Sequence, residues 1–330
     1  MLLLPWLAAC APVLAPPGPG AERPEILERP LGPWRWLTAD GYELVLRRWA
    51  PDEGEPRAVI LALHGFNDHS TFIEGAAAAW AADGIATYAY DQRGFGNAPN
   101  RGYWAGAATY ADDAATLAAL LARRHPGAPI YLLGESMGGA IAMITATRHP
   151  EAPLAGVILS APAVWARSTM PFYQRWSLFL ASYSVPWFKM SGEGLDIQAS
   201  DNLEALRELS RDPLVIKRTR VDAVHGLADL MDEALAAAPT LTPPALLLYG
   251  AKDELVPADP MFRLWESLPA EAQSRQRQAL YKNGWHLLFK DLDAKLVIAD
   301  VAAWIQAPDA PLPSGADRHA SEALATLQVE

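Results

Sequence analysis

The sequence predicts an α/β fold: a mostly parallel, twisted sheet flanked by helices, with a helical lid inserted between two strands. Short apolar runs alternate with helical patterns between about residues 34 and 306, which is typical of a parallel sheet covered on both faces. This alternation stops near Pro162 and resumes at residue 244, and the segment between is rich in aromatic residues. We therefore expect a lid at about residues 165–240.

Composition supports a large buried core and excludes several classes of function. The chain has 330 residues, of which 51% are hydrophobic and 20% charged, so global disorder is excluded. It carries 27 Lys and Arg against 38 Asp and Glu, a net charge of −11, without a basic tract that would bind nucleic acid. A single cysteine excludes a disulfide scaffold and a cysteine-based zinc site. We expect no metal and no organic cofactor.

The individual elements follow from local patterns. Apolar runs predict strands at residues 42–46, 57–63, 84–90, 129–133, 154–160, 244–249 and 276–282. The first of these follows an Asp-Gly turn signal at residues 40–41 and is expected to be one arm of a hairpin. Helical patterns lie at about residues 71–82, 110–124, 137–149, 258–268 and 289–305. Thr71 and Glu74 have the spacing of a capping box for the first helix.

The two ends of the chain have a different composition. Residues 1–33 begin with an apolar run that prolines interrupt, so this run does not predict a membrane-spanning helix. Residues 7–10 (LAAC) resemble a bacterial lipobox, and a proline-rich tether follows. We expect lipidation of Cys10 and a location at the bacterial cell envelope; the alternative is an untargeted, cytoplasmic chain. Residues 307–330 lack an apolar pattern and are expected to form a disordered tail.

The segment Gly134-Glu135-Ser136-Met137-Gly138 fits the pattern G-x-S-x-G. It follows an apolar strand and opens a helix, which is the context that a nucleophile elbow requires. In such a turn the flanking glycines avoid steric clashes and the serine is exposed in a strained conformation. We therefore expect Ser136 to be a nucleophile.

A serine nucleophile needs a base, and the base needs a carboxylate that orients it. His286 follows the last predicted strand, so it should reach the same sheet edge as Ser136. His225, inside the predicted lid, stays open as an alternative base. Asp253 follows the preceding strand and is the expected carboxylate, with Glu254 as the neighbour most easily confused with it. The chain order Ser136, Asp253, His286 is that of α/β-hydrolases.

An oxyanion needs two backbone N–H donors. The residue after the nucleophile, Met137, should supply one, and the loop after the strand at 57–63 should supply the other. In this loop His64 and Gly65 permit a sharp turn, which leaves the N–H of Phe66 as the second donor. We expect His64 to brace the loop through hydrogen bonds.

These stretches resemble the monoacylglycerol lipase and bacterial lysophospholipase branch of the α/β-hydrolase superfamily, which includes serine aminopeptidase-type hydrolases. The resemblance covers roughly residues 34–305. It is carried by residues 64–70 (HGFNDHS), 91–96 (DQRGFG), 134–139 (GESMGG) and 210–214 (SRDPL) and by the Asp253 and His286 loops. The resemblance implies the same triad and oxyanion donors. It also implies that Asp68 lies near the polar head of the substrate.

The function expected from these residues is hydrolysis of a lipid-like carboxylic ester through an acyl-enzyme. One alternative is an aminopeptidase on the same fold, because the lid contains the acidic residues Glu193, Asp196 and Glu204. A second is a catalytically silent lipid-binding lipoprotein. The expected partner is a small-molecule lipid ester, with membrane association through Cys10; the sequence indicates no oligomeric state.

Overall fold

A computed structural model describes residues 11–192, 194, 197–269 and 275–327. Within them a nine-stranded sheet has the order β1-β2-β3-β5-β4-β6-β7-β10-β11. The pairs β1–β2, β2–β3 and β3–β5 are antiparallel, and the other pairs are parallel. The strands are β1 (Glu25–Leu27), β2 (Trp34–Leu37), β3 (Glu43–Trp49), β4 (Ala58–Leu63), β5 (Ile85–Tyr90), β6 (Ile130–Glu135), β7 (Leu154–Ser160), β10 (Ala245–Gly250) and β11 (Gln276–Tyr281).

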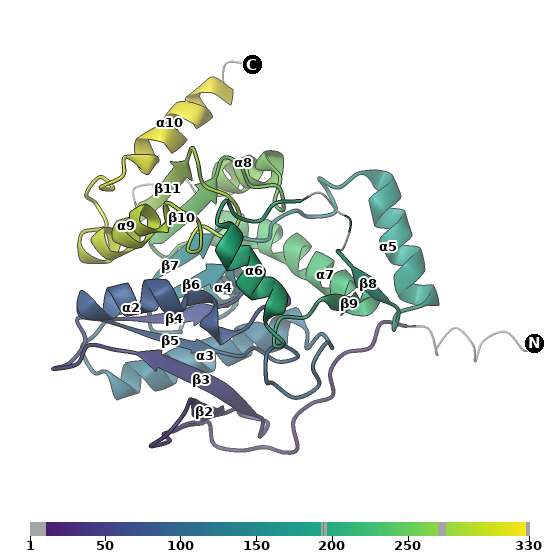
Figure 1. Cartoon of the computed structure of the whole chain (residues 1–330), viewed down its shortest axis with the longest axis horizontal. Coiled ribbons are helices and arrows are strands. Elements are labelled where there is room, and N and C mark those ends of the chain that lie inside the picture. The colour runs from purple at the N-terminus through teal and green to yellow at the C-terminus, as the bar shows by residue number, and fades with distance from the viewer. Residues whose placement is uncertain (1–10, 193, 195–196, 270–274, 328–330) are drawn as a thin grey trace, which may run out of the picture.

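Helices cover both faces of this sheet (Figure 1). One face packs against α2 (Glu74–Ala82) and α9 (Ala294–Gln306), and the other packs against α3 (Ala107–Arg124), α4 (Met137–Arg148) and α8 (Ala258–Ser267). All residues of the central strands β4, β5, β6 and β10 are buried. This double coverage explains why these strands are continuously apolar in the sequence rather than alternating. The predicted fold class is therefore confirmed.

The start of α2 differs from the prediction. A 3-10 helix, η2 (Ser70–Ile73), precedes it, so Thr71 lies within that turn and the residue before α2 is Ile73. Thr71 Oγ1 lies 3.3 Å from the ring nitrogens of His69 and does not cap α2. The predicted capping box is therefore wrong.

The N-terminal tether is packed on the domain over its described part. The N–H of Ala15 donates to the carbonyl of Trp104 at 2.7 Å, and the N–H of Gly18 donates to Asp40 at 2.8 Å. Further along, β1 adds an antiparallel strand to the sheet beside β2. The domain thus begins before the predicted boundary at residue 34, because extended proline-rich chain still offers backbone groups that pair with the domain.

The predicted disordered tail at residues 307–330 is also corrected. Residues Ala316–Leu327 form a helix, α10, that packs along β11, the edge strand of the sheet (Figure 1). Leu312, Ala316 and Ala320 are buried, and Asp317 accepts a hydrogen bond from Arg277 of β11 at 2.9 Å. A short helix whose apolar residues are mostly alanines leaves a weak sequence pattern, yet it covers an edge strand that would otherwise expose unpaired backbone groups.

The predicted insertion lies between β7 and β10 and is largely helical. It contains α5 (Phe172–Ser184), α6 (Leu203–Arg211) and α7 (Val221–Ala237), with the antiparallel pair β8 (Lys189–Ser191) and β9 (Arg218–Arg220). A second 3-10 helix, η3 (Ala238–Thr240), follows α7. We call residues 172–190 the outer half of the insertion and residues 198–220 its anchored half.

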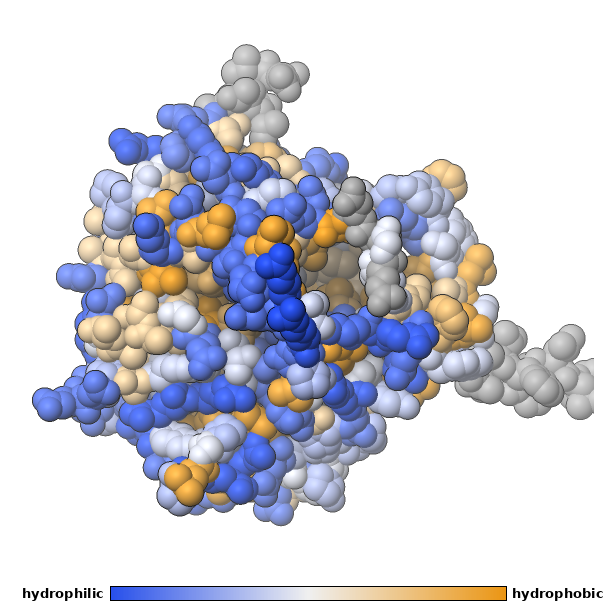
Figure 2. Space-filling model, viewed as in Figure 1, coloured by the Kyte–Doolittle hydropathy of each residue, from blue (hydrophilic) through white to orange (hydrophobic). Residues whose placement is uncertain are grey.

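The two halves differ in what their side chains contact. Large apolar side chains of the outer half are exposed, and Figure 2 shows orange side chains gathered over α5 at the right edge of the molecule.

Within the described residues, no helix is both long and apolar enough to cross a membrane.

Candidate active site

Ser136 stands in a strained turn between β6 and α4. Its backbone has φ 53° and ψ −116°, a conformation that non-glycine residues rarely adopt. The turn is possible because the glycines beside it have no side chains. A Cβ at Gly134 would collide with the carbonyl of Gly138, and one at Gly138 would collide with the carbonyl of Leu63. The structure thus has the strained strand–turn–helix geometry that the G-x-S-x-G pattern predicts.

Asp253 and His286 form a buried pair at the same sheet edge. The Nδ1 of His286 lies 2.8 Å from Oδ2 of Asp253, and their side chains are 3% and 0% exposed, respectively. The other carboxylate oxygen, Oδ1, accepts hydrogen bonds from the backbone N–H groups of Leu255 and Val256 at 2.8 and 2.9 Å. These bonds fix the carboxylate, and with it the orientation of the imidazole.

The loops that carry this pair are joined to each other. The N–H of Ala251 donates to the carbonyl of Tyr281, and the N–H of Lys252 donates to that of Gly284, both at 2.9 Å. These bonds continue the pairing of the parallel strands β10 and β11 beyond their ends. Adjacent parallel strands therefore bring Asp253 and His286 together although they are 33 positions apart.

The predicted oxyanion loop lies beside Ser136. A Cβ added to Gly65 would be only 3.4 Å from Cβ of Ser136, so the backbone of the 64–68 loop passes next to the nucleophile. Met137 is the first residue of α4, where backbone N–H groups have no partner within the helix. The aromatic ring of Phe66 packs against Phe95 and Trp104, with ring centroids 5.6 and 6.3 Å away.

His64 braces this loop from within the core, as expected. Its Nδ1 lies 2.8 Å from the carbonyl oxygen of Gly65, and its Nε2 accepts the N–H of Gln92 at 3.0 Å. Full burial lowers the pKa of His64 and outweighs the opposing effect of nearby carboxylates. A neutral imidazole can accept the hydrogen bond from Gln92, which agrees with a structural role.

The electrostatics around His286 favour its protonated form. Burial alone would lower the pKa of His286, but the charge and hydrogen bond of Asp253, with added contributions from Glu135 and Asp291, raise it above its ordinary value. Stabilisation of the imidazolium is what a general base requires once it has taken a proton. The structure thus adds two carboxyl groups to the surroundings of the predicted base.

Glu135, the residue before Ser136, was not expected to have a role. It is 1% exposed, and its Oε2 has no hydrogen-bond partner among the described residues. Burial, reinforced by the charge of Asp68, raises the pKa of Glu135 to about 7. A glutamate inside an otherwise apolar strand end is the sequence signal that could have drawn attention to it.

The remaining predicted positions stand as follows. Asp68 is buried in the oxyanion loop, where its Oδ1 accepts the N–H of His69 at 2.8 Å. His225 lies on α7, with its Nδ1 3.4 Å from Arg167 and its ring 5.9 Å from that of Tyr183. These contacts are with the insertion and not with Asp253, which favours His286 as the base. Cys10 lies outside the described residues.

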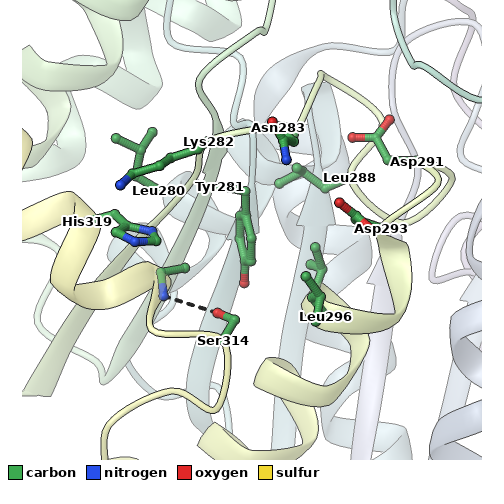
Figure 3. A pocket seen from close by; sticks show the side chains of 13 residues that line it. Leu280, Tyr281, Lys282, Asn283, Leu288, Asp291, Asp293, Leu296, Ser314 and His319 are labelled. Atoms are coloured by element: carbon green, nitrogen blue, oxygen red, sulfur yellow. Dashed lines mark hydrogen bonds between the residues drawn. The ribbon is translucent and has the colours of Figure 1, made fainter.

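A cavity of about 230 Å³ lies behind the His286 loop, between β11, α9 and the segment leading into α10 (Figure 3). Leu288, Leu296 and Tyr281 line it together with Asp291, Asp293 and His319. None of the three predicted triad residues lines this cavity. It is therefore separate from the site at Ser136, although it shares the His286 loop as one wall.

Comparisons with known proteins identify the family of this chain. The family described as "Hydrolase_4: Serine aminopeptidase, S33" matches residues 54–293. The chain is 30% identical to a monoacylglycerol lipase of Mycolicibacterium smegmatis over 80% of this chain and 93% of that protein. It is 27% identical to the human monoglyceride lipase over 82% of this chain and 88% of that protein.

Solved structures show the same fold. The crystal structure of a Paleococcus ferrophilus monoacylglycerol lipase superimposes with a TM-score of 0.68 at 24% identity, covering 80% of this chain and 98% of that chain. A soluble variant of the Saccharomyces cerevisiae monoglyceride lipase gives the same TM-score at 19% identity, covering 88% and 98%. The chain therefore belongs to the serine aminopeptidase S33 family and is a hydrolase of the α/β-hydrolase fold, similar to the carboxylic ester hydrolases named monoacylglycerol lipase.

Proposed function

We propose that this chain hydrolyses the carboxylic ester of a monoacylglycerol or a lysophospholipid through an acyl-enzyme on Ser136. The observation that carries the proposal is the buried Asp253–His286 pair, 2.8 Å apart, at the sheet edge where Ser136 stands in its strained turn. Relatives named monoacylglycerol lipase support a lipid ester as the substrate.

In the first half of the reaction, Oγ of Ser136 forms a bond to the carbonyl carbon of the ester. Nε2 of His286 takes the hydroxyl proton, because its Nδ1 is held by Asp253. The N–H groups of Phe66 and Met137 stabilise the negative charge on the carbonyl oxygen. The bond to the alcohol oxygen then breaks, and the proton on His286 passes to the leaving alcohol, such as glycerol.

In the second half, water replaces the alcohol. His286 takes a proton from water as its oxygen attacks the acyl carbon, and the same two N–H groups stabilise the second oxyanion. The bond to Oγ of Ser136 breaks, Ser136 recovers its proton from His286, and the fatty acid leaves. In this mechanism Asp68, on the oxyanion loop, faces the polar head of the substrate.

The exposed apolar side chains of the outer half favour the proposal that the substrate is apolar and is presented at a lipid surface. Phe172, Trp176 and Leu180 on α5 are 73%, 62% and 59% exposed, which is costly in water unless the face meets another apolar surface. The net charge of −11 disfavours adsorption to anionic lipid by charge alone. We propose that this insertion is the lid of the site and that its outer half contacts lipid.

Lipidation of Cys10 and a location at the bacterial cell envelope belong to the same proposal. The N–H of Val13 lies 3.4 Å from a carboxylate oxygen of Asp222, and the N–H of Asp222 donates to the carbonyl of Pro186, beside the exposed Trp187. The described end of the tether thus lies beside the outer half of the insertion, the part proposed to contact lipid. Replacement of Cys10 by serine should release the protein from the membrane fraction and abolish incorporation of labelled fatty acid.

An aminopeptidase would need carboxylates that bind the free α-amine of its substrate. Of the acidic residues considered for this role, Glu204 is 63% exposed and pairs with Arg207 at 3.2 Å, and Glu193 and Asp196 lie outside the described residues. This pairing favours the esterase. A silent lipid-binding protein would have no need of the buried Asp253–His286 pair.

The test is release of fatty acid from monoacylglycerols of several chain lengths, with lysophospholipid and an amino-acid anilide as competing substrates. Ser136→Ala is the control and should lose activity by several orders of magnitude. Activity on the anilide alone would mean that the protein is a peptidase and not an esterase. If a fluorophosphonate fails to label Ser136 and no substrate is cleaved, the acyl-enzyme mechanism is wrong.

A further inference from the structure

The anchored half of the insertion is joined to the loops of the catalytic pair by a short segment, residues 198–202. Five hydrogen bonds of 2.6–2.9 Å make this connection. They run from the N–H of Gln198 to Glu254, from the N–H of Leu287 to the carbonyl of Ala199, from Ser200 to Asp291, from Asn202 to the carbonyl of Lys290, and from the N–H of Leu292 to Asp201. Four of the five end on residues 287–292, directly after His286.

Asp291 is the centre of this arrangement. Its Oδ1 accepts a hydrogen bond from the hydroxyl of Ser200 at 2.6 Å, and its Oδ2 accepts one from the backbone N–H of Trp285 at 2.7 Å. Trp285 immediately precedes His286, so the carboxylate holds the backbone from which the base projects. Both partners are buried, with Ser200 0% and Asp291 6% exposed. In Figure 3 Asp291 lies at the edge of the cavity behind this loop.

We propose that Asp291 is a positioning residue for His286, and that Ser200 of the insertion holds Asp291 in place. The inference rests on the proposed function, in which His286 is the general base. It adds that the insertion supports the catalytic base directly, beyond any role in covering the site.

Physical reasons make this connection matter for rate. Catalytic groups must be held within about half an ångström of their productive positions, and displacements of about 1 Å can cost roughly a hundredfold in rate. Asp253 fixes only the ring of His286, through Nδ1. The backbone of residue 286 needs its own support. The buried carboxylate of Asp291 supplies it by accepting the backbone N–H of Trp285, while the hydroxyl of Ser200 holds that carboxylate in place.

The experiment compares four variants of the full chain with the wild type. Ser200→Ala removes the hydroxyl donor, and Asp291→Ala removes both acceptors. Asp291→Asn is the conservative variant, because its amide oxygen can accept the N–H of Trp285 while its NH₂ donates to Ser200. Ser177→Ala is the matched control: its hydroxyl donates to the carbonyl of Gln174 on the exposed surface of α5. The measurements are kcat and KM on a soluble p-nitrophenyl ester and the rate of fluorophosphonate labelling of Ser136.

We expect kcat and the labelling rate to fall roughly tenfold in Ser200→Ala and more in Asp291→Ala, with KM changed less than twofold. Asp291→Asn also removes a charge that raises the pKa of His286, so its pH profile should shift to lower pH. On the alkaline plateau, kcat of Asp291→Asn and of Ser177→Ala should stay within about threefold of the wild type. The downfield proton signal of His286 Nδ1 should broaden or shift in Ser200→Ala, which a role in stability alone would not cause. Should Asp291→Ala fail to fold, Ser200→Ala and Asp291→Asn still decide the matter.

Two failures can be told apart. A wild-type protein that neither reacts with the fluorophosphonate nor cleaves the ester would overturn the proposed function. A reactive wild type with an equally reactive Ser200→Ala variant would overturn only the positioning role. Equal losses in Asp291→Asn and Asp291→Ala would also overturn it, because the amide preserves the hydrogen bonds.

Discussion

The two halves of the insertion have opposite relations to the rest of the molecule. In the outer half, the aromatic side chains of α5 are exposed. Helix α5 packs mainly against α7, and the end of the outer half pairs through β8 with β9. In the anchored half, Asp212 pairs with His69 at 2.9 Å, and Ile216 and Thr219 bond to Asn67 at 2.9 and 2.7 Å. The anchored half thus contacts the loop of residues 64–69 as well as the His286 loop, whereas the outer half leaves its large apolar side chains exposed.

The largest expected effect is on kcat, from a change in the Asp253–His286 pair, whose loops the anchored half contacts. Asp253→Asn should lower kcat by about four orders of magnitude, because an amide cannot favour the tautomer in which Nδ1 of His286 carries the proton. Steady-state kinetics on a soluble ester would measure the loss. The control is Glu254→Gln, which keeps an acceptor for the N–H of Gln198 and should stay within about threefold. Similar losses in both variants would contradict the assignment of Asp253.

The sequence predicted the catalytic residues and the core elements but not the contacts that the insertion makes with them. Apolar runs predicted β3 and every parallel strand of the sheet, and helical patterns predicted the five helices α2, α3, α4, α8 and α9; the short strands β1, β2, β8 and β9 were missed. The rule that parallel strands end at one edge placed Ser136, Asp253 and His286 together. The supports of the site were not predictable. Ser200 and Asp291 are 91 positions apart, and nothing local to either residue indicates that they meet. The helix α10 was missed for a related reason, since its partner is a strand edge.

The second expected effect concerns Glu135, which lies between the loops that the anchored half holds. Its pKa is raised from 4.5 to about 7, so above pH 4.5 the unfolded chain gives up a proton that the folded protein retains. The free energy of unfolding should therefore fall as the pH rises from 4.5 to 7, by at most roughly 3 kcal/mol.

Glu135→Gln, which cannot ionise, tests this directly by denaturant unfolding at pH 5 and pH 8. The variant should gain stability relative to the wild type at pH 8 and much less at pH 5. Glu74→Gln, at an exposed position of α2, should show the same small difference at both values. A Glu135→Gln advantage that does not grow with pH would show that the folded protein does not bind the extra proton.

The third prediction concerns the hydrogen bond by which Thr219 of the anchored half holds Asn67 of the oxyanion loop. Thr219→Val keeps the shape of the side chain but removes the acceptor for the amide of Asn67, the neighbour of Phe66. Loosening this loop should lower kcat roughly fivefold with little change in KM, since the oxyanion forms only after binding. Thr240→Val, whose hydroxyl donates only to the carbonyl of Ala237 at the surface, is the control. A rise in KM with an unchanged kcat would instead assign Thr219 to substrate binding.

The smallest effect in solution is expected from the outer half, and it separates the two halves most clearly. Replacing the exposed Trp176 and Phe179 together by serine removes apolar surface that touches no catalytic loop, so activity on a soluble ester should stay within about twofold. On monoacylglycerol presented in zwitterionic vesicles, the same variant should lose several-fold in rate, because fewer apolar side chains can enter the lipid surface. Leu31→Ser, which exchanges a leucine that is 89% exposed and lies at a distance from α5, should lose nothing on either substrate. An equal loss on both substrates would mean that the outer half also supports the catalytic loops, and the division of the insertion into two halves would then be wrong.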